Sequence, residues 1–104
     1  MSPEAVCDLL GLYPRRAMGE FYAAWQKRPD GADAVPMPFA ELVETVARNK
    51  PSKVRPAVDV LVRSELIERA GSIKSLRGHP RNLYRVLPMG EAVGATLQRR
   101  DERR

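Results

Sequence analysis

The sequence contains very little cysteine and histidine. Cys7 and His79 are the only residues of their types among 104. One cysteine excludes a disulfide framework and a cysteine-based zinc site, and one histidine cannot build a metal site. Glu4 and Asp8 are predicted to lie together on a helix, but no nucleophile, histidine partner or glycine-rich loop accompanies them. We therefore expect no enzyme activity, no metal and no cofactor.

Long apolar runs are also absent. The longest run is only a few residues, whereas a membrane-spanning helix needs about 20. Residues 1–30 lack the apolar core of a signal peptide, because Arg15 and Arg16 are followed by Ala-Met-Gly-Glu. We expect a cytoplasmic protein with no membrane partner. The length of 104 residues excludes a multi-domain enzyme and predicts one domain over residues 1–104.

Positive charge is concentrated in one part of the chain. Lys and Arg total 18 and Asp and Glu total 13, for a net charge of +5. Residues 1–47 have four basic and seven acidic residues, whereas residues 48–85 have ten basic and three acidic residues. Residues 86–104 carry one net positive charge. A net positive charge favours nucleic-acid binding. Because most of this charge lies in residues 48–85, we expect the binding surface there.

Five segments have the apolar spacing of amphipathic helices. They are approximately residues 3–10, 15–27, 38–48, 52–64 and 89–100. Ser2 and Ser52 are expected to cap the first and fourth helices, and Gly11 is expected to stop the first. Pro56 is tolerated only in a first turn, so it places the start of the fourth helix near Ser52 or Lys53. A short extended segment is expected at residues 34–37.

From Leu66 the pattern changes from helix to strand. Residues 66–87 predict an antiparallel hairpin, with a basic turn over residues 77–82 and a stop at Pro88. The predicted fold class is therefore α+β and mostly helical. It has a two-stranded β-hairpin and an extra helix at each terminus.

Four segments have the order and spacing of one known fold. They are Phe39–Leu42, Ser52–Leu61, Leu66–Arg69 and Tyr84–Gly90. These segments resemble, in turn, the start of a helix-turn-helix motif, its recognition helix, the strand that enters a wing, and the strand that leaves it. Over about residues 15–88 the chain resembles winged helix-turn-helix proteins of the MarR-like and PadR-like regulators. Those regulators usually have glycine where this chain has Glu65, so the turn there is expected to differ.

The resemblance implies a transcriptional regulator that binds double-stranded DNA. Helix 52–64 would lie in the major groove, and wing 74–82 would lie on adjacent backbone or in the minor groove. The candidate DNA-binding residues are polar or exposed positions of these two segments: Lys50, Ser52, Lys53, Arg55, Pro56, Asp59, Arg63, Lys74, Arg77, His79 and Arg81. Arg55 could pair with guanine, and Ser52 and Lys53 at the helix start suit phosphates.

Several residues also have plainer explanations. Basic residues on a helix are often only a solvated face. Arg69 and Arg85 are equally explained as structural ion pairs with Glu68 or Glu65. Cys7 is expected to be a small buried residue, with redox sensing as the alternative.

Three predictions about partners remain. The terminal helices exceed the minimal winged-helix fold, so we expect a homodimer formed through them that reads two half-sites about one DNA turn apart. The alternative function is a protein-interaction module in a transcription or RNA-processing assembly, acting through the acidic half or the apolar stripe that contains Trp25. RNA binding through the same basic segment is a third possibility.

Overall fold

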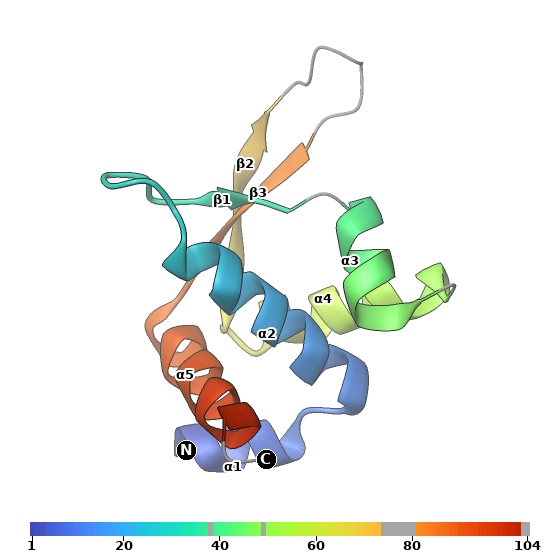
Figure 1. Cartoon of the computed structure of the whole chain (residues 1–104), viewed down its shortest axis with the longest axis vertical. Helices are drawn as coiled ribbons and strands as arrows, with labels where there is room; N and C mark the ends of the chain where they lie inside the picture. The colour runs from blue at the N-terminus through green and yellow to red at the C-terminus, as the bar shows by residue number, and fades with distance from the viewer. Residues whose placement is uncertain (38, 49, 74–80, 103–104) are drawn as a thin grey trace.

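The structure is a computed structural model that describes residues 1–37, 39–48, 50–73 and 81–102. Its elements follow the predicted order (Figure 1). They are α1 (Pro3–Leu9), α2 (Leu12–Gln26), β1 (Val35–Pro36), α3 (Phe39–Ala47), the 3-10 turn η1 (Pro51–Lys53), α4 (Val54–Arg63), β2 (Ile67–Ile73), β3 (Arg81–Val86) and α5 (Pro88–Glu102). The α+β, mostly helical class is confirmed. No helix within the described ranges combines the length and apolarity needed to cross a bilayer.

The sheet has three antiparallel strands rather than the two that the sequence predicted. Their order is β1-β3-β2, so β3 is central. Val35 pairs with Tyr84 and Pro36 with Leu83. Pro36 is tolerated because β1 is an edge strand, where a missing N–H leaves no ladder bond unmade. The extended segment was expected near residues 34–37, but its pairing with β3 was not.

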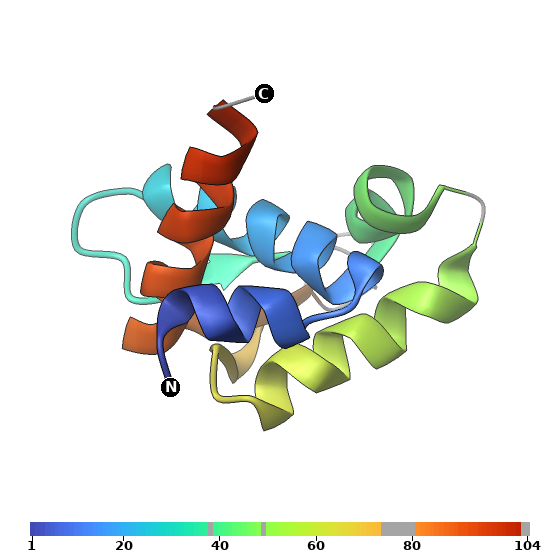
Figure 2. The same cartoon turned by 90° about the horizontal axis from the view of Figure 1, so that it is seen from below.

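Helix α2 is the centre of the core. It lies between the α1–α5 pair and the α3–α4 pair, as Figure 1 and Figure 2 both show. Met18 and Phe21 on α2 are fully buried. The Phe21 ring meets the Tyr84 ring edge to face, with centroids 5.0 Å apart, which joins the central helix to the central strand.

The terminal helices bury their apolar faces within the chain. Cys7 on α1 is fully buried, and its Sγ lies 3.7 Å from the carbonyl oxygen of Val93 on α5. Burial raises the pKa of the Cys7 thiol, so it stays neutral at physiological pH. The predicted burial is confirmed. A neutral, enclosed thiol is a poor nucleophile, which argues against the redox-sensing alternative.

Of three predicted caps and stops at helix ends, two differ in the structure and one is confirmed. Gly11 is the N-cap of α2 rather than the stop of α1, because Pro14 fits the first turn of a helix that begins at Leu12. Ser52 does not cap α4, since it lies in η1 and Lys53 occupies the N-cap without a side-chain bond. The Ser2 cap is confirmed, because Ser2 Oγ accepts from the Ala5 N–H at 3.2 Å.

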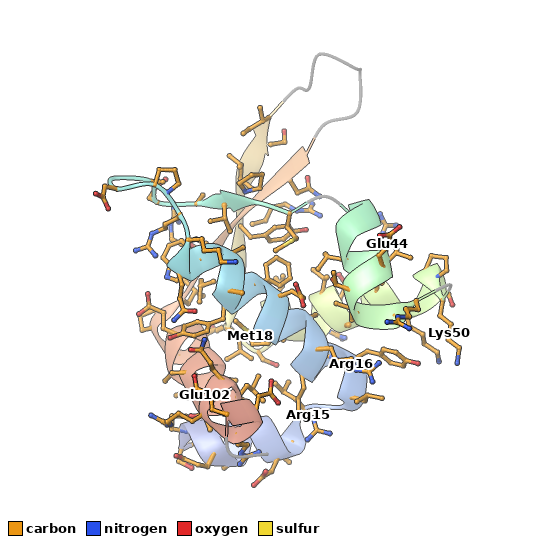
Figure 3. All side chains as sticks on the ribbon, in the orientation of Figure 1. Arg15, Arg16, Met18, Glu44, Lys50 and Glu102 are labelled. Atoms are coloured by element: carbon orange, nitrogen blue, oxygen red, sulfur yellow. The ribbon has the colours of Figure 1, made fainter. Side chains whose placement is uncertain are left out.

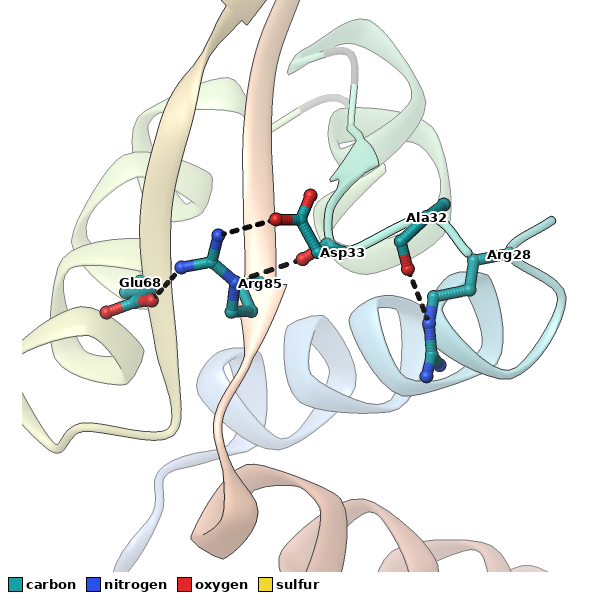
Figure 4. Close-up of polar contacts among 5 residues, drawn as sticks. All are labelled: Arg28, Ala32, Asp33, Glu68 and Arg85. Atoms are coloured by element: carbon teal, nitrogen blue, oxygen red, sulfur yellow. Dashed lines mark hydrogen bonds and ion pairs between the residues drawn. The ribbon is translucent and has the colours of Figure 1, made fainter. Parts of the chain in front are cut away.

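Two arginines fasten the loop that leads into β1 (Figure 4). Arg85 donates from Nε to the Asp33 carbonyl at 3.0 Å and from Nη2 to Asp33 Oδ2 at 3.2 Å, and its Nη1 pairs with Glu68. The hydrogen bond to Glu68 raises the pKa of Arg85. Arg28 donates to the Ala32 carbonyl at 3.1 Å. Arg85 is therefore a structural residue that ties this loop to β2 and β3.

Helix α4 ends in a Schellman motif whose left-handed residue is not glycine. The Leu66 N–H donates to the Leu61 carbonyl at 3.0 Å, and the Glu65 N–H donates to the Val62 carbonyl at 3.1 Å. Glu65 has φ 58°, a conformation that costs a residue with a Cβ about 1–2 kcal/mol. The residue that ends this turn therefore has the left-handed conformation that favours glycine, and its backbone is strained because it is Glu65.

Glu65→Gly is expected to stabilise the protein by about 0.5–1 kcal/mol. Removing Cβ relieves the left-handed strain, and the greater freedom of glycine in the unfolded chain offsets part of that gain. Urea unfolding with a constant m-value would measure the change. The control is Glu44→Gly, at an exposed position inside α3, which should destabilise by about 1 kcal/mol. A loss of stability in Glu65→Gly would contradict the prediction.

Candidate nucleic-acid interface

Helix α4 has one buried face and one exposed polar face. Val54, Ala57 and Leu61 are buried against the core. The predicted contact residues on or beside α4 are all exposed: Lys50, Ser52, Lys53, Arg55, Pro56, Asp59 and Arg63. The structure therefore brings this half of the predicted site to the surface, on the side of α4 that does not pack on α2.

A stripe of three charged side chains runs along the exposed face of α4. Arg55, Asp59 and Arg63 are spaced four residues apart, so they lie above one another on the helix. Arg63 Nε is 3.4 Å from the backbone carbonyl of Asp59. No ion pair within the described ranges engages any of the three. The stripe keeps donors at both ends and an acceptor in the middle for an external partner.

The other half of the predicted site falls mainly outside the described residues. Lys74, Arg77 and His79 belong to segment 74–80, which the structure does not describe. Arg81 is the first residue of β3 and pairs with Ile73 of β2. Strands β2 and β3 extend away from the helices (Figure 1). The prediction for the wing tip is untested.

The sequence-based prediction missed a basic groove beside the turn between α3 and α4. The groove has a volume of about 470 Å³, and its lining includes Tyr13, Arg16, Arg48 and Lys50. Figure 3 shows Arg16 and Lys50 toward the same end of α3. Only Lys50 was among the predicted site residues. The closeness of Arg48 and Lys50 to a predicted turn was an available signal, whereas Arg16 lies in the net-acidic part of the sequence.

A second groove, of about 570 Å³, runs between α2 and α5. Its lining mixes both signs of charge, since Arg15 and Arg100 are accompanied by Glu20 and Asp101. A mixed lining has no preference for a phosphate. Within the described ranges, no group of three histidine, cysteine, aspartate or glutamate residues could hold a metal ion.

The Trp25 ring is not an exposed docking surface. Trp25 is buried, and its Nε1 donates to Glu91 Oε1 on α5 at 2.7 Å. The Arg28 guanidinium carbon lies 3.7 Å from the centroid of the same ring. Its ring is therefore used inside the chain to join α2 to α5, which weakens the prediction that this stripe recruits another protein.

Comparison of the chain with models of protein families, with curated proteins and with solved structures gave no match.

Proposed function

We propose that the chain is a sequence-specific transcriptional regulator that binds double-stranded DNA as a winged helix-turn-helix protein. The order α2, β1, α3, α4, β2 and β3 supports this proposal, as does the short turn between α3 and α4. The observation that carries the proposal is the charged, unpaired stripe of α4 opposite a fully buried face. An α-helix with such a face fits the major groove and can present side chains to base edges.

Each residue of the stripe has a role that follows from its chemistry. Arg55, in the first turn of α4, could donate two hydrogen bonds to guanine O6 and N7. The Asp59 carboxylate can accept from the N4 amino group of cytosine. Ser52 and Lys53 precede the positive end of α4 and suit backbone phosphates, which fix orientation rather than sequence. From their sequence, Lys74, Arg77, His79 and Arg81 are assigned to flanking backbone or the minor groove.

Arg55→Ala is expected to relax the preferred base at one position of the DNA site. One good bidentate arginine–guanine pair contributes about 1–3 kcal/mol of discrimination, so the preference there should fall roughly tenfold or more. The measurement is selection of bound duplexes from a random pool, followed by titration of single-base variants at fixed salt. A palindromic selected motif would also support the proposed homodimer.

Lys27→Ala is the matched control for the loss of one positive charge. Lys27 is exposed and follows the last residue of α2, whereas the basic groove lies at the start of that helix. It should leave base preference unchanged. Arg77→Ala combined with Arg81→Ala should instead weaken binding to all sequences and flatten the salt dependence. The proposal fails if the unaltered protein selects no motif, or if Arg55→Ala selects the same motif with the same strength.

Dimerisation stays a prediction. The argument for it from the extra terminal helices is weakened by the structure. The apolar faces of α1 and α5 are covered inside one chain, so they need no partner to bury them. Leu9 and Leu12, however, remain 72% and 50% exposed between α1 and α2. Sedimentation velocity of the protein with and without its DNA site would detect a homodimer.

A further inference from the structure

The groove beside the α3–α4 turn has the chemistry of an anion site. It lies between the start of α2 and the end of α3. Three of its lining side chains are cationic, those of Arg16, Arg48 and Lys50, and no carboxylate is among its described lining residues. At about 470 Å³ it has ample room for one phosphodiester group with its water shell.

We propose that this groove binds a phosphate of the DNA backbone next to the bases read by α4. The inference rests on the function proposed above and extends the DNA-contacting surface to α2. Lys50 connects the two regions, because it lines the groove and is also the N-cap residue of η1, which leads directly into α4. A duplex that lies against the start of α4 would therefore also lie close to the groove.

The three cations are available to a phosphate. The Arg48 and Lys50 side chains are exposed and have no hydrogen bond or ion pair within the described ranges. Arg16 donates from Nη1 to the Val46 carbonyl at 3.4 Å, which positions the guanidinium and leaves its other donors for a ligand. Glu20 and Glu44 lie one helical turn from Arg16 and Arg48, but no ion pair within the described ranges engages the three cations, so most of their attraction for an anion is retained.

The end of α3 does not oppose an anion strongly. The last carbonyls of a helix carry partial negative charge, but here two of them are already bonded. Val46 accepts from Arg16, and Ala47 accepts from the Lys50 N–H at 2.7 Å. Tyr13 adds a phenol group to the lining, and its ring centroid lies 6.0 Å from the Arg16 guanidinium carbon. A tyrosine hydroxyl can donate to a phosphate oxygen.

The test is the salt dependence of duplex binding by an Arg16→Gln and Arg48→Gln double variant. Fluorescence anisotropy at several potassium chloride concentrations would give the slope of log affinity against log salt. We expect a slope shallower by about 1, since one fewer phosphate is neutralised. Affinity should fall roughly tenfold for a preferred and a scrambled duplex alike, because a phosphate contact carries no sequence information.

The matched control is a Lys27→Gln and Arg99→Gln double variant. It removes the same two positive charges at exposed positions outside the groove. Its slope should equal that of the unaltered protein. If loss of the Arg16–Val46 bond prevents folding, Arg48→Gln alone decides the question. That side chain has no described partner, and its loss should shift slope and affinity in the same direction.

The outcomes separate this inference from the proposed function. Duplex binding that is sequence-selective in the unaltered protein but keeps its slope in both groove variants overturns the groove and leaves the α4 proposal standing. Absence of any salt-dependent duplex binding overturns both. A loss of affinity for an RNA hairpin without a loss for duplex DNA also overturns the assignment, because the groove would then serve RNA.

Discussion

Gly90→Ala is expected to destabilise the protein by about 3 kcal/mol. A Cβ at this position would lie 1.9 Å from the Leu66 carbonyl oxygen and 2.8 Å from its carbon. That carbonyl is backbone, and it accepts the Leu87 N–H at 3.0 Å, so it cannot turn aside like a flexible side chain. Relief of the clash requires α5 to move away from the turn between α4 and β2. We therefore expect a loss of stability at the upper end of the range for overpacking substitutions. Urea unfolding would measure the change.

Gly19→Ala is the matched control, because it is the same substitution in the interior of α2, where the new Cβ would have no heavy atom within 4 Å apart from adjacent residues and the backbone of its own helix. Alanine has the higher helix propensity, so this variant should be stabilised by about 0.5–1 kcal/mol. The two substitutions are therefore expected to have opposite signs. Equal losses of stability in both variants would contradict the packing of α5 described above.

Leu61→Ala is expected to destabilise the protein by about 3 kcal/mol. The side chain is fully buried between α4 and the rest of the core. Truncation removes buried apolar surface and leaves a cavity, which for leucine costs about 2–5 kcal/mol. Leu61 also accepts the Leu66 N–H in the Schellman motif, and both side chains are fully buried in the core. Thermal and urea unfolding followed by circular dichroism would give the loss.

Val62→Ala is the control for Leu61→Ala, since the next residue is on the same helix but 39% exposed. Its effect should be well below that of Leu61→Ala, about 0.5–1 kcal/mol. If the two variants lost similar stability, α4 would not be oriented with Leu61 inward and Val62 outward. The exposed stripe of Arg55, Asp59 and Arg63 would then have to be reassigned as well.

The local parts of the fold were predictable because they depend on neighbours along the chain. The apolar spacing of Val54, Ala57 and Leu61 identified both faces of α4, and Pro56 limited where its helix could begin. The capping role of Ser52 was wrong, since the same local sequence also permits the 3-10 turn that forms. Pairing of Val35 with Tyr84 could not be predicted, because it joins residues far apart in sequence through a strand of two residues.

The candidate site was likewise predictable only where it depends on neighbours along the chain. The exposed residues of α4 follow from helix periodicity, so they could be named from the sequence. Arg16 could not, because only the packing of α2 on α3 carries it from the net-acidic N-terminal part into a basic groove with Arg48. The net charge of a segment does not show which charges lie close together in the folded chain, whereas a phosphate is attracted by charges that are close in space. Arg85 was left open by sequence, and its partners Glu68 and Asp33 decide that it is structural.

The pairing of α1 with α5 has a consequence for how the chain folds as it is made. Helix α1 has seven residues, fewer than the dozen or so that an isolated helix needs in water. Its buried residue Cys7 is covered by Val93, which the ribosome adds 86 residues later. Helix α1 therefore has no packing partner until α5 has emerged from the ribosome. Native burial of the N-terminal helix therefore requires α5, and a nascent chain stalled before α5 would leave Cys7 open to thiol reagents.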